Sequence, residues 1–145
     1  MRQPRPILSP AAQAGYSLLE LLVVLAILAL IIGIAAPRVM GYFSASKGKA
    51  AKIQIQNIVT TLDLYKMDNN TYPSETQGLK ALVEKPEGAT NWNGPYLTRA
   101  DGIIDPWDRP YLYKVPGVHG AVDVSSLGAD GKDGGTGEDQ DISSW

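Results

Sequence analysis

Residues 15–36 read GYSLLELLVVLAILALIIGIAA, and this stretch decides the fold. A helix from Tyr16 to Ala36 would be roughly 30 Å long at about 1.5 Å per residue, which matches the thickness of a bilayer core. Glu20 is the only charged residue in it, because residues 21–36 carry no charge. The sequence therefore predicts a transmembrane helix over residues 16–36 with a carboxylate in its first turn.

Three interpretations of this helix compete. A secretory signal peptide would have a shorter apolar region and a cleavage site that is not followed directly by proline, whereas Pro37 comes straight after the small residues 35–36. An ordinary membrane anchor accounts for the apolar run. It leaves Glu20 unexplained, because a carboxylate inside a spanning helix is costly and usually has a partner or a function.

The third interpretation accounts for both features. If the chain is cut between Gly15 and Tyr16, the new α-amino group lies at the start of the helix, where the helix dipole opposes a cation. Glu20, from the same chain or from a neighbouring one, would neutralise that amine. In an assembly of parallel helices each subunit would then enter only at the register that pairs both charges, since an unpaired buried charge is strongly unfavourable.

The helix changes character after Pro37. A proline inside a helix removes one hydrogen bond and bends the axis or melts the preceding turn, so we expect a helix break at Pro37. Farther on, apolar residues recur at spacings of three and four, the pattern of one helix face: Ile55, Ile58, Val59, Leu62 and Tyr65. Residues 37–67 are therefore predicted to form an amphipathic half of the long helix, packed on a water-soluble domain.

Residues 68–145 are predicted to form that domain. A capping-box pattern at 74–77 predicts a short helix to about residue 84. Two short strands are expected at 110–114 and 120–126 around a turn at 116–120, with an edge segment at 94–97. Trp92 and Trp107 are expected in the core and His119 in solvent. The fold class is thus α+β, a long N-terminal helix packed on a small antiparallel sheet.

Composition excludes several functions. The net charge is −2, there is no cysteine and there is one histidine. These numbers argue against a globally basic nucleic-acid binder, a disulfide scaffold, a cysteine zinc site and a histidine-based catalytic triad. The basic stretch Arg38, Lys47, Lys49 and Lys52 is interpreted as a solvated helix face near anionic lipid head groups. No catalytic motif is visible, so we expect no enzyme.

Two sets of motifs carry a family resemblance. Gly15-Tyr16-Ser17-Leu18-Leu19-Glu20 resembles the processing site of type IV prepilins. In the second half, the motifs occur in order: DNNTYP from residue 68, QGLKAL from 77, GPYL from 94, DPWD from 105 and SLGADG from 126. Together they are similar to the major pseudopilins of type II secretion systems, members of the pilin-like superfamily.

The resemblance implies a function and a location. A prepilin peptidase would remove the leader 1–15 and N-methylate Tyr16, and Glu20 would guide assembly. The product would be a structural subunit of a homopolymeric pseudopilus that drives export of folded proteins. It would cross the bacterial inner membrane once, with its C-terminal domain in the periplasm, and would contact minor pseudopilins and the inner-membrane assembly platform. The alternatives are a minor pseudopilin, a type IV pilin, or a monomeric membrane-tethered calcium-dependent binding protein.

The loop 127–142 is glycine-rich and holds five acidic residues. From the residues alone, a disordered acidic turn and a calcium site are both open, since Ca²⁺ takes six to eight carboxylate and carbonyl oxygens. The resemblance implies calcium, with Asp130 and Asp141 as side-chain ligands and the Leu127 carbonyl as a third. Asp139 is the expected third carboxylate, with Asp133 and Glu138 as rivals. Trp145 is expected to pack the end of this loop against the domain.

Overall fold

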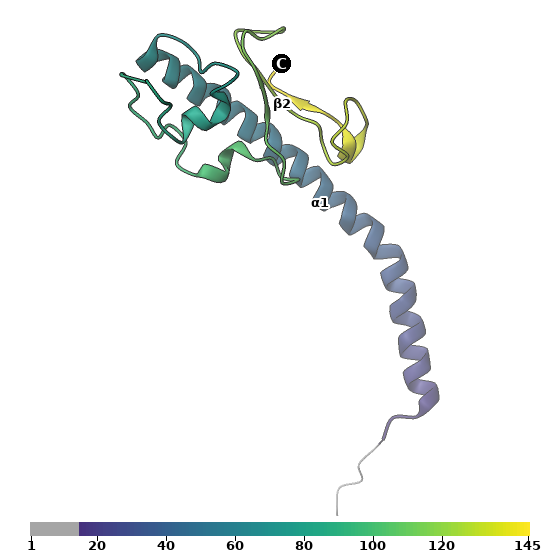
Figure 1. Cartoon of the computed structure of the whole chain (residues 1–145). Helices are drawn as coiled ribbons and strands as arrows, with labels where there is room; N and C mark the ends of the chain where they lie inside the picture. Colours follow the sequence, from purple (N-terminus) through teal and green to yellow (C-terminus); the bar gives the residue numbers. More distant parts are fainter. Residues whose placement is uncertain (1–14) are drawn as a thin grey trace, which may run out of the picture. The chain divides into compact units, whose positions relative to one another are not determined.

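A computed structural model of the chain describes residues 15–145, so the predicted leader lies outside the described residues except for Gly15. The chain divides into two units, Met1–Val39 and Met40–Trp145. One helix, α1 (Leu18–Asn69), supplies the described helical part of the first unit and the first element of the second (Figure 1). Each unit is compact by itself.

In the first unit none of the described residues covers the apolar helix. Every described residue from Gly15 to Ala36 is exposed, Leu18 to 89% and Ile32 to 62%. The helix is long and apolar enough to cross a membrane. A surface of this kind is unstable in water, because each exposed apolar side chain forgoes its transfer free energy. It therefore needs lipid or other apolar helices around it.

The predicted helix break at Pro37 is not seen in the single chain. α1 is assigned as one uninterrupted helix through Pro37. A proline in a helix removes only one backbone hydrogen bond, and the surrounding turns retain theirs. The prediction of a break at Pro37 is thus wrong for the isolated chain.

The second unit forms its core on one face of α1. The buried hydrophobic residues of this helix segment are Ala51, Ile55, Ile58, Leu62 and Tyr65, none more than 4% exposed. They pack with Leu79, Ala81, Leu82, Leu97, Tyr111, Val122 and Val124. Four of the five residues of the predicted stripe are therefore buried, while Val59 is partly buried at its edge. The helix ends at Asn69, and Asn70 follows with a positive φ of 62°.

Three short strands make an antiparallel sheet in the order β1-β2-β3. They are β1 (Leu112–Lys114), β2 (Asp123–Ser126) and β3 (Ile142–Ser143). Tyr113 pairs with Val124, and Ser126 pairs with Ile142. The two predicted strands are confirmed in shortened form, whereas the third was not predicted because two residues carry no periodicity. β2 is the central strand and is mostly buried, with Val124 fully inside.

The remaining segments are short helical turns and loops. Ser74 and Gln77 form a reciprocal capping box, in which the Ser74 N–H donates to Gln77 Oε1 at 2.9 Å and the Gln77 N–H donates to Ser74 Oγ at 3.2 Å. The helix that follows is the 3₁₀ helix η1 (Gly78–Leu82). The edge segment expected at 94–97 is not a strand: the Tyr96 and Leu97 amides both donate to the Leu82 carbonyl. Two more 3₁₀ helices follow, η2 (Ala100–Ile103) and η3 (Gly137–Asp139).

Candidate functional site

The head of α1 is organised by Ser17. Its Oγ accepts a hydrogen bond from the Glu20 N–H at 3.2 Å, so Ser17 caps the helix that begins at Leu18. Glu20 lies in the first turn, where the positive end of the helix dipole favours a carboxylate. The Ser-Leu-Leu-Glu spacing is that of a capping box, a signal in the sequence that pointed to Ser17 and was missed.

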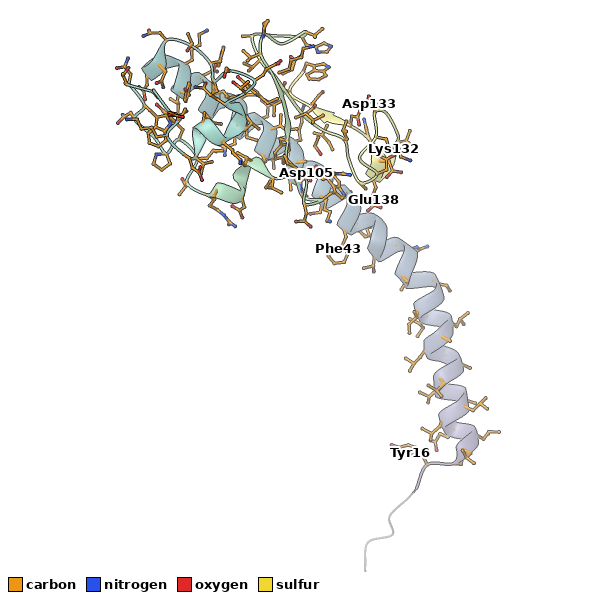
Figure 2. All side chains as sticks on the ribbon, viewed as in Figure 1. Tyr16, Phe43, Asp105, Lys132, Asp133 and Glu138 are labelled. Carbon is orange, nitrogen blue, oxygen red and sulfur yellow. The ribbon has the colours of Figure 1, made fainter. Side chains whose placement is uncertain are left out.

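The structure places the predicted processing residues at this helix end. Gly15, Tyr16 and Ser17 precede the helix in exposed chain without regular secondary structure, and Tyr16 is 77% exposed. Figure 2 shows Tyr16 just before the start of the helix. A peptide bond in exposed, non-helical chain is accessible to a peptidase, whereas one inside a helix is protected by its hydrogen bonds. The segment therefore has the local structure that cleavage between Gly15 and Tyr16 requires.

The loop between β2 and β3 contains all the predicted metal ligands. Five of its glycines have φ between 64° and 93°: Gly128, Gly131, Gly134, Gly135 and Gly137. Its two arms touch, since the Ala129 N–H donates to the Glu138 carbonyl at 2.8 Å and a Cβ on Gly128 would lie 2.8 Å from the Gln140 oxygen. Glycine is thus needed at 128, both for its φ and for this close approach.

The carboxylates of the loop are only partly brought together. Asp141 Oδ2 accepts from the Gly134 amide at 2.8 Å, and Asp130 Oδ1 accepts from the Lys132 amide at 3.0 Å. Within residues 15–145 no group of three or more acidic or histidine side chains is close enough to hold a metal ion. Leu127, Asp130, Asp139 and Asp141 therefore share one loop without forming a ready-made cluster of carboxylates.

One oxygen in this loop lacks a partner. Asp141 Oδ1 is buried and makes no hydrogen bond to the described residues. A buried acceptor left unpaired costs about 1–3 kcal/mol, and more when it is charged. A hard cation is one partner that would remove this cost, because carboxylate and carbonyl oxygens are the ligands that Ca²⁺ prefers. The donor types in the loop and this oxygen fit a calcium ion.

The DPWD motif forms a hub beside the loop. Asp105, which is 5% exposed, accepts hydrogen bonds from the Trp107 and Arg109 amides at 2.9 Å each and from the Ser126 hydroxyl at 2.6 Å. Arg109 Nε lies 3.9 Å from the same carboxylate. Burial and the nearby Asp105 charge raise the pKa of Tyr111 to about 12. The hub fixes the end of β2 from which the loop leaves.

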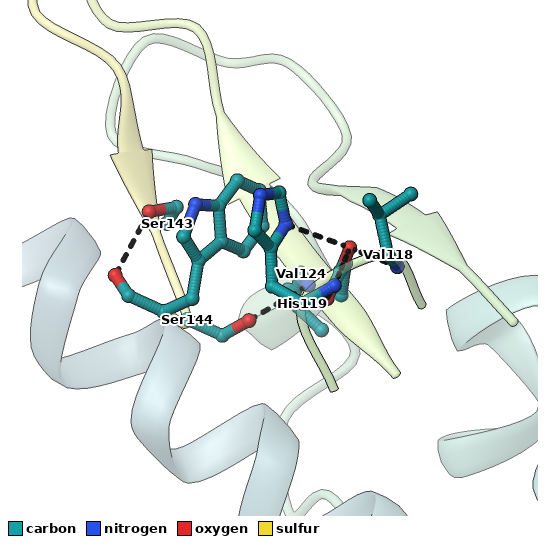
Figure 3. A network of polar contacts seen from close by, with 7 residues as sticks. Val118, His119, Val124, Ser143 and Ser144 are labelled. Atoms are coloured by element: carbon teal, nitrogen blue, oxygen red, sulfur yellow. Dashed lines mark hydrogen bonds and ion pairs between the residues drawn. The ribbon is translucent and has the colours of Figure 1, made fainter. Parts of the chain in front are cut away.

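The last residue of the chain packs against the 116–120 turn. The Trp145 ring stacks on His119, with ring centroids 4.0 Å apart and an interplanar angle of 8° (Figure 3). His119 Nδ1 is 3.2 Å from Asp123 Oδ2, and the Val118 amide donates to the same oxygen at 2.7 Å. The expected exposure of His119 is confirmed, and its ring also contacts Trp145 and Asp123. Trp145 remains 55% exposed.

Asp123 is held in its charged form. Burial raises the pKa of its carboxyl, but the hydrogen bonds from the Val118 amide and from His119 outweigh this and leave the pKa below its ordinary value. The turn also needs glycine at 117, because a Cβ there would lie 2.6 Å from Asp123 Oδ1. Turn, central strand and C-terminal residues are thus joined through one carboxylate.

The basic stretch on α1 is more than a solvated face. Lys52 Nζ donates to the Ser143 carbonyl at 2.6 Å and so ties β3 to the helix. Lys47 lies 6.0 Å from the centre of the Trp107 ring, within the range of a cation–π contact. Both lysines are exposed and still contact distant parts of the domain, and these contacts were not predicted from the sequence. Trp92 and Trp107 pack against the core as predicted.

Comparisons with known proteins agree with this arrangement. A family model described as "Type II secretion system (T2SS), protein G" matches residues 38–145, and one described as "Prokaryotic N-terminal methylation motif" matches residues 10–36. The chain belongs to the protein G family of the type II secretion system. The resemblance stated from its motifs is confirmed, and the family consists of structural pseudopilins.

Similar proteins cover nearly the whole chain. The type II secretion system core protein G of Pseudomonas aeruginosa is 45% identical over 137 residues, which is 92% of this chain and 95% of that protein. The protein of the same name from Vibrio cholerae is 40% identical over 92% of both chains. The crystal structure of the major pseudopilin of enterohaemorrhagic Escherichia coli matches with a TM-score of 0.59 at 33% identity, covering 73% of this chain and 92% of that one. The pilin-like α+β fold is thereby confirmed.

Proposed function

We propose that this protein G family member is a major pseudopilin, the repeating structural subunit of a pseudopilus that drives export of folded proteins. One observation carries the proposal: every described residue of the apolar helix up to Ala36 is exposed, with Glu20 in its first turn. Identical helices packed side by side would cover that surface. In this role the protein works by assembly and is not an enzyme.

Maturation creates a positively charged N-terminus, which Glu20 neutralises. A prepilin peptidase removes residues 1–15 and N-methylates the new terminus at Tyr16. The resulting ammonium lies next to the positive end of the helix dipole, which opposes it, so a neighbouring carboxylate stabilises it. Before assembly, Glu20 already stabilises this end of the helix. Its carboxylate lies at the positive end of the helix dipole, and its backbone N–H donates a hydrogen bond to Ser17 Oγ. A subunit that enters the filament at the right register pairs its amine with the Glu20 of its neighbour.

The proposal includes a place in the cell. The helix crosses the bacterial inner membrane once, with the C-terminal domain in the periplasm. The assembly platform in the inner membrane adds subunits, and minor pseudopilins join the same filament. Intact mass of the membrane-extracted protein tests maturation, with loss of residues 1–15 and gain of one methyl group expected.

Glu20→Ala tests the assembly. The variant is expected to be cleaved and to retain a folded domain while forming no filaments in sheared-cell fractions and in electron micrographs. Glu87→Ala is the matched control, since Glu87 is an exposed acid in a loop of the second unit. A monomeric membrane-tethered binding protein would tolerate Glu20→Ala. Normal filaments from this variant would therefore refute the proposal.

We further propose that the loop 127–142 binds Ca²⁺. The residues that would hold it are the Leu127 carbonyl and the carboxylates of Asp130, Asp139 and Asp141. Asp141 Oδ1, which is buried and has no hydrogen-bond partner among the described residues, supports this assignment. Bound calcium would neutralise the repulsion among the five carboxylates and stabilise the glycine-rich turns, a role that a disulfide plays in other folds.

A chelator tests the calcium proposal. The midpoint of thermal unfolding of the full chain in detergent is expected to fall when EGTA removes calcium and to recover when CaCl₂ is added in excess. Magnesium chloride at equal ionic strength is the control, because Mg²⁺ demands a smaller, octahedral site. Identical melts with EGTA and with calcium would contradict the proposal.

A further inference from the structure

Arg109 links the DPWD motif to the acidic loop. Its backbone is fixed by Asp105, since the Arg109 N–H donates to Asp105 Oδ1 at 2.9 Å and the Asp105 N–H donates to the Arg109 carbonyl at 2.7 Å. The preceding residue, Asp108, has a φ of 64°, which turns the chain at this point. The side chain is only 34% exposed and extends from this fixed base toward the loop.

The guanidinium contacts the backbone of the loop at two positions. Nη1 donates to the Ala129 carbonyl at 3.4 Å, a long hydrogen bond. It also packs directly on Gly131, where a Cβ would clash with Nη1. Ala129 and Gly131 are the two neighbours of Asp130, a proposed calcium ligand. The orientation of Asp130 therefore depends on how Arg109 holds the residues on either side of it.

One N–H group of the guanidinium lacks a hydrogen-bond partner among the described residues. Nη2 is buried and has no hydrogen-bond partner among residues 15–145. Arginine presents its donors in a rigid plane, so Nη1 and Nη2 act together on neighbouring oxygens. Asp105 provides the opposite charge on the far side, at 3.9 Å from Nε. A half-buried guanidinium with one long hydrogen bond to Ala129, and one donor that has no partner among the described residues, is well placed to hold the loop.

We infer that Arg109 is a positioning residue of the loop 127–142: its guanidinium fixes residues 129–131 and thereby sets the oxygens with which the loop binds calcium. This inference rests on the proposed calcium site. Arg109 itself is not a ligand, since a cation does not coordinate a metal ion. It acts through the Ala129 carbonyl and the Gly131 backbone on Asp130.

Calorimetric titration with CaCl₂ tests the inference on the calcium-stripped full chain in detergent. Arg109→Met is expected to raise the Kd for calcium at least about tenfold, the effect of losing one hydrogen bond from a charged donor. Arg109→Lys keeps the charge without the planar fork and is expected to fall between Met and wild type. Arg99→Met is the matched control and should bind calcium as wild type does, because Arg99 is exposed and its one ion pair within residues 15–145 is with Asp101.

The outcomes separate the two proposals. If wild type binds calcium and Arg109→Met binds with the same Kd, the positioning role is overturned and the calcium site stands. If wild type does not bind calcium, the site itself is refuted. A purely structural contact would lower the unfolding midpoint in EGTA while leaving the Kd unchanged, and that result also overturns the inference. Should Arg109→Met fail to fold, Arg109→Lys decides, and an unchanged Kd in that variant refutes the role.

Discussion

Removal of the Asp105 carboxylate should cost the domain much of its stability. The Asp105 side chain is 1% exposed and accepts three hydrogen bonds, from two backbone amides and from the Ser126 hydroxyl. Hydrogen bonds to a charged group contribute about 1.5–3 kcal/mol each, but three bonds to one group are not additive. Removing one partner of a buried ionic network typically costs about 3–5 kcal/mol, and we expect Asp105→Ala to fall in that range.

Thermal unfolding followed by tryptophan fluorescence measures the effect, because Trp107 lies in the turn that Asp105 holds. For a domain of this size about 4–8 °C of midpoint corresponds to 1 kcal/mol, so Asp105→Ala should lower the midpoint by more than about 10 °C. Asp105→Asn keeps one acceptor oxygen and should lose roughly half as much. The matched control is Asp101→Ala, since Asp101 is exposed and, in the described part of the chain, forms an ion pair with Arg99 alone.

The reasoning depends on burial and not on charge as such. Asp101→Ala should leave the midpoint unchanged, because exposed ion pairs contribute little to stability. A midpoint for Asp105→Ala within about 3 °C of wild type would show that water replaces the lost hydrogen bonds and that the hub does not hold the fold. Equal losses from Asp101→Ala and Asp105→Ala would refute the argument from burial.

Two further predictions concern the core and the turn at 116–120. Ile58→Ala should lower the free energy of unfolding by about 2–5 kcal/mol, because Ile58 is fully buried. Ile53→Ala is the control and should leave the unfolding midpoint nearly unchanged, because Ile53 is 71% exposed. Similar losses at both positions would count against the assigned core face. The pKa of Asp123 in the folded protein lies below its ordinary value of 3.8. The ionised carboxylate therefore contributes to folding stability above pH 3.8, and this contribution is lost as the pH falls through the folded-state pKa. The wild-type midpoint should therefore fall more steeply than that of Asp123→Asn on acidification below about pH 4, and parallel pH profiles would contradict this assignment.

The sequence by itself determined the helix and the family. Apolar length and the lone Glu20 define a membrane helix because a bilayer imposes a fixed thickness and penalises charge. The spacing of Ile55, Ile58 and Leu62 identified the buried face, since helix geometry alone puts such residues on one side. The motifs of the second half identified the protein G family. All of these signals are local in the chain.

Only the tertiary structure decided the contacts between distant segments. Lys52 reaches Ser143, Trp145 stacks on His119, and Arg109 holds Ala129, and no spacing in the sequence predicts these pairs. β3 is too short to show a period, and it exists because β2 offers it backbone partners. Side-chain partners far apart in the chain are set by packing of the whole domain. The sequence therefore specified which residues carry the chemistry, and the fold decided which of them meet.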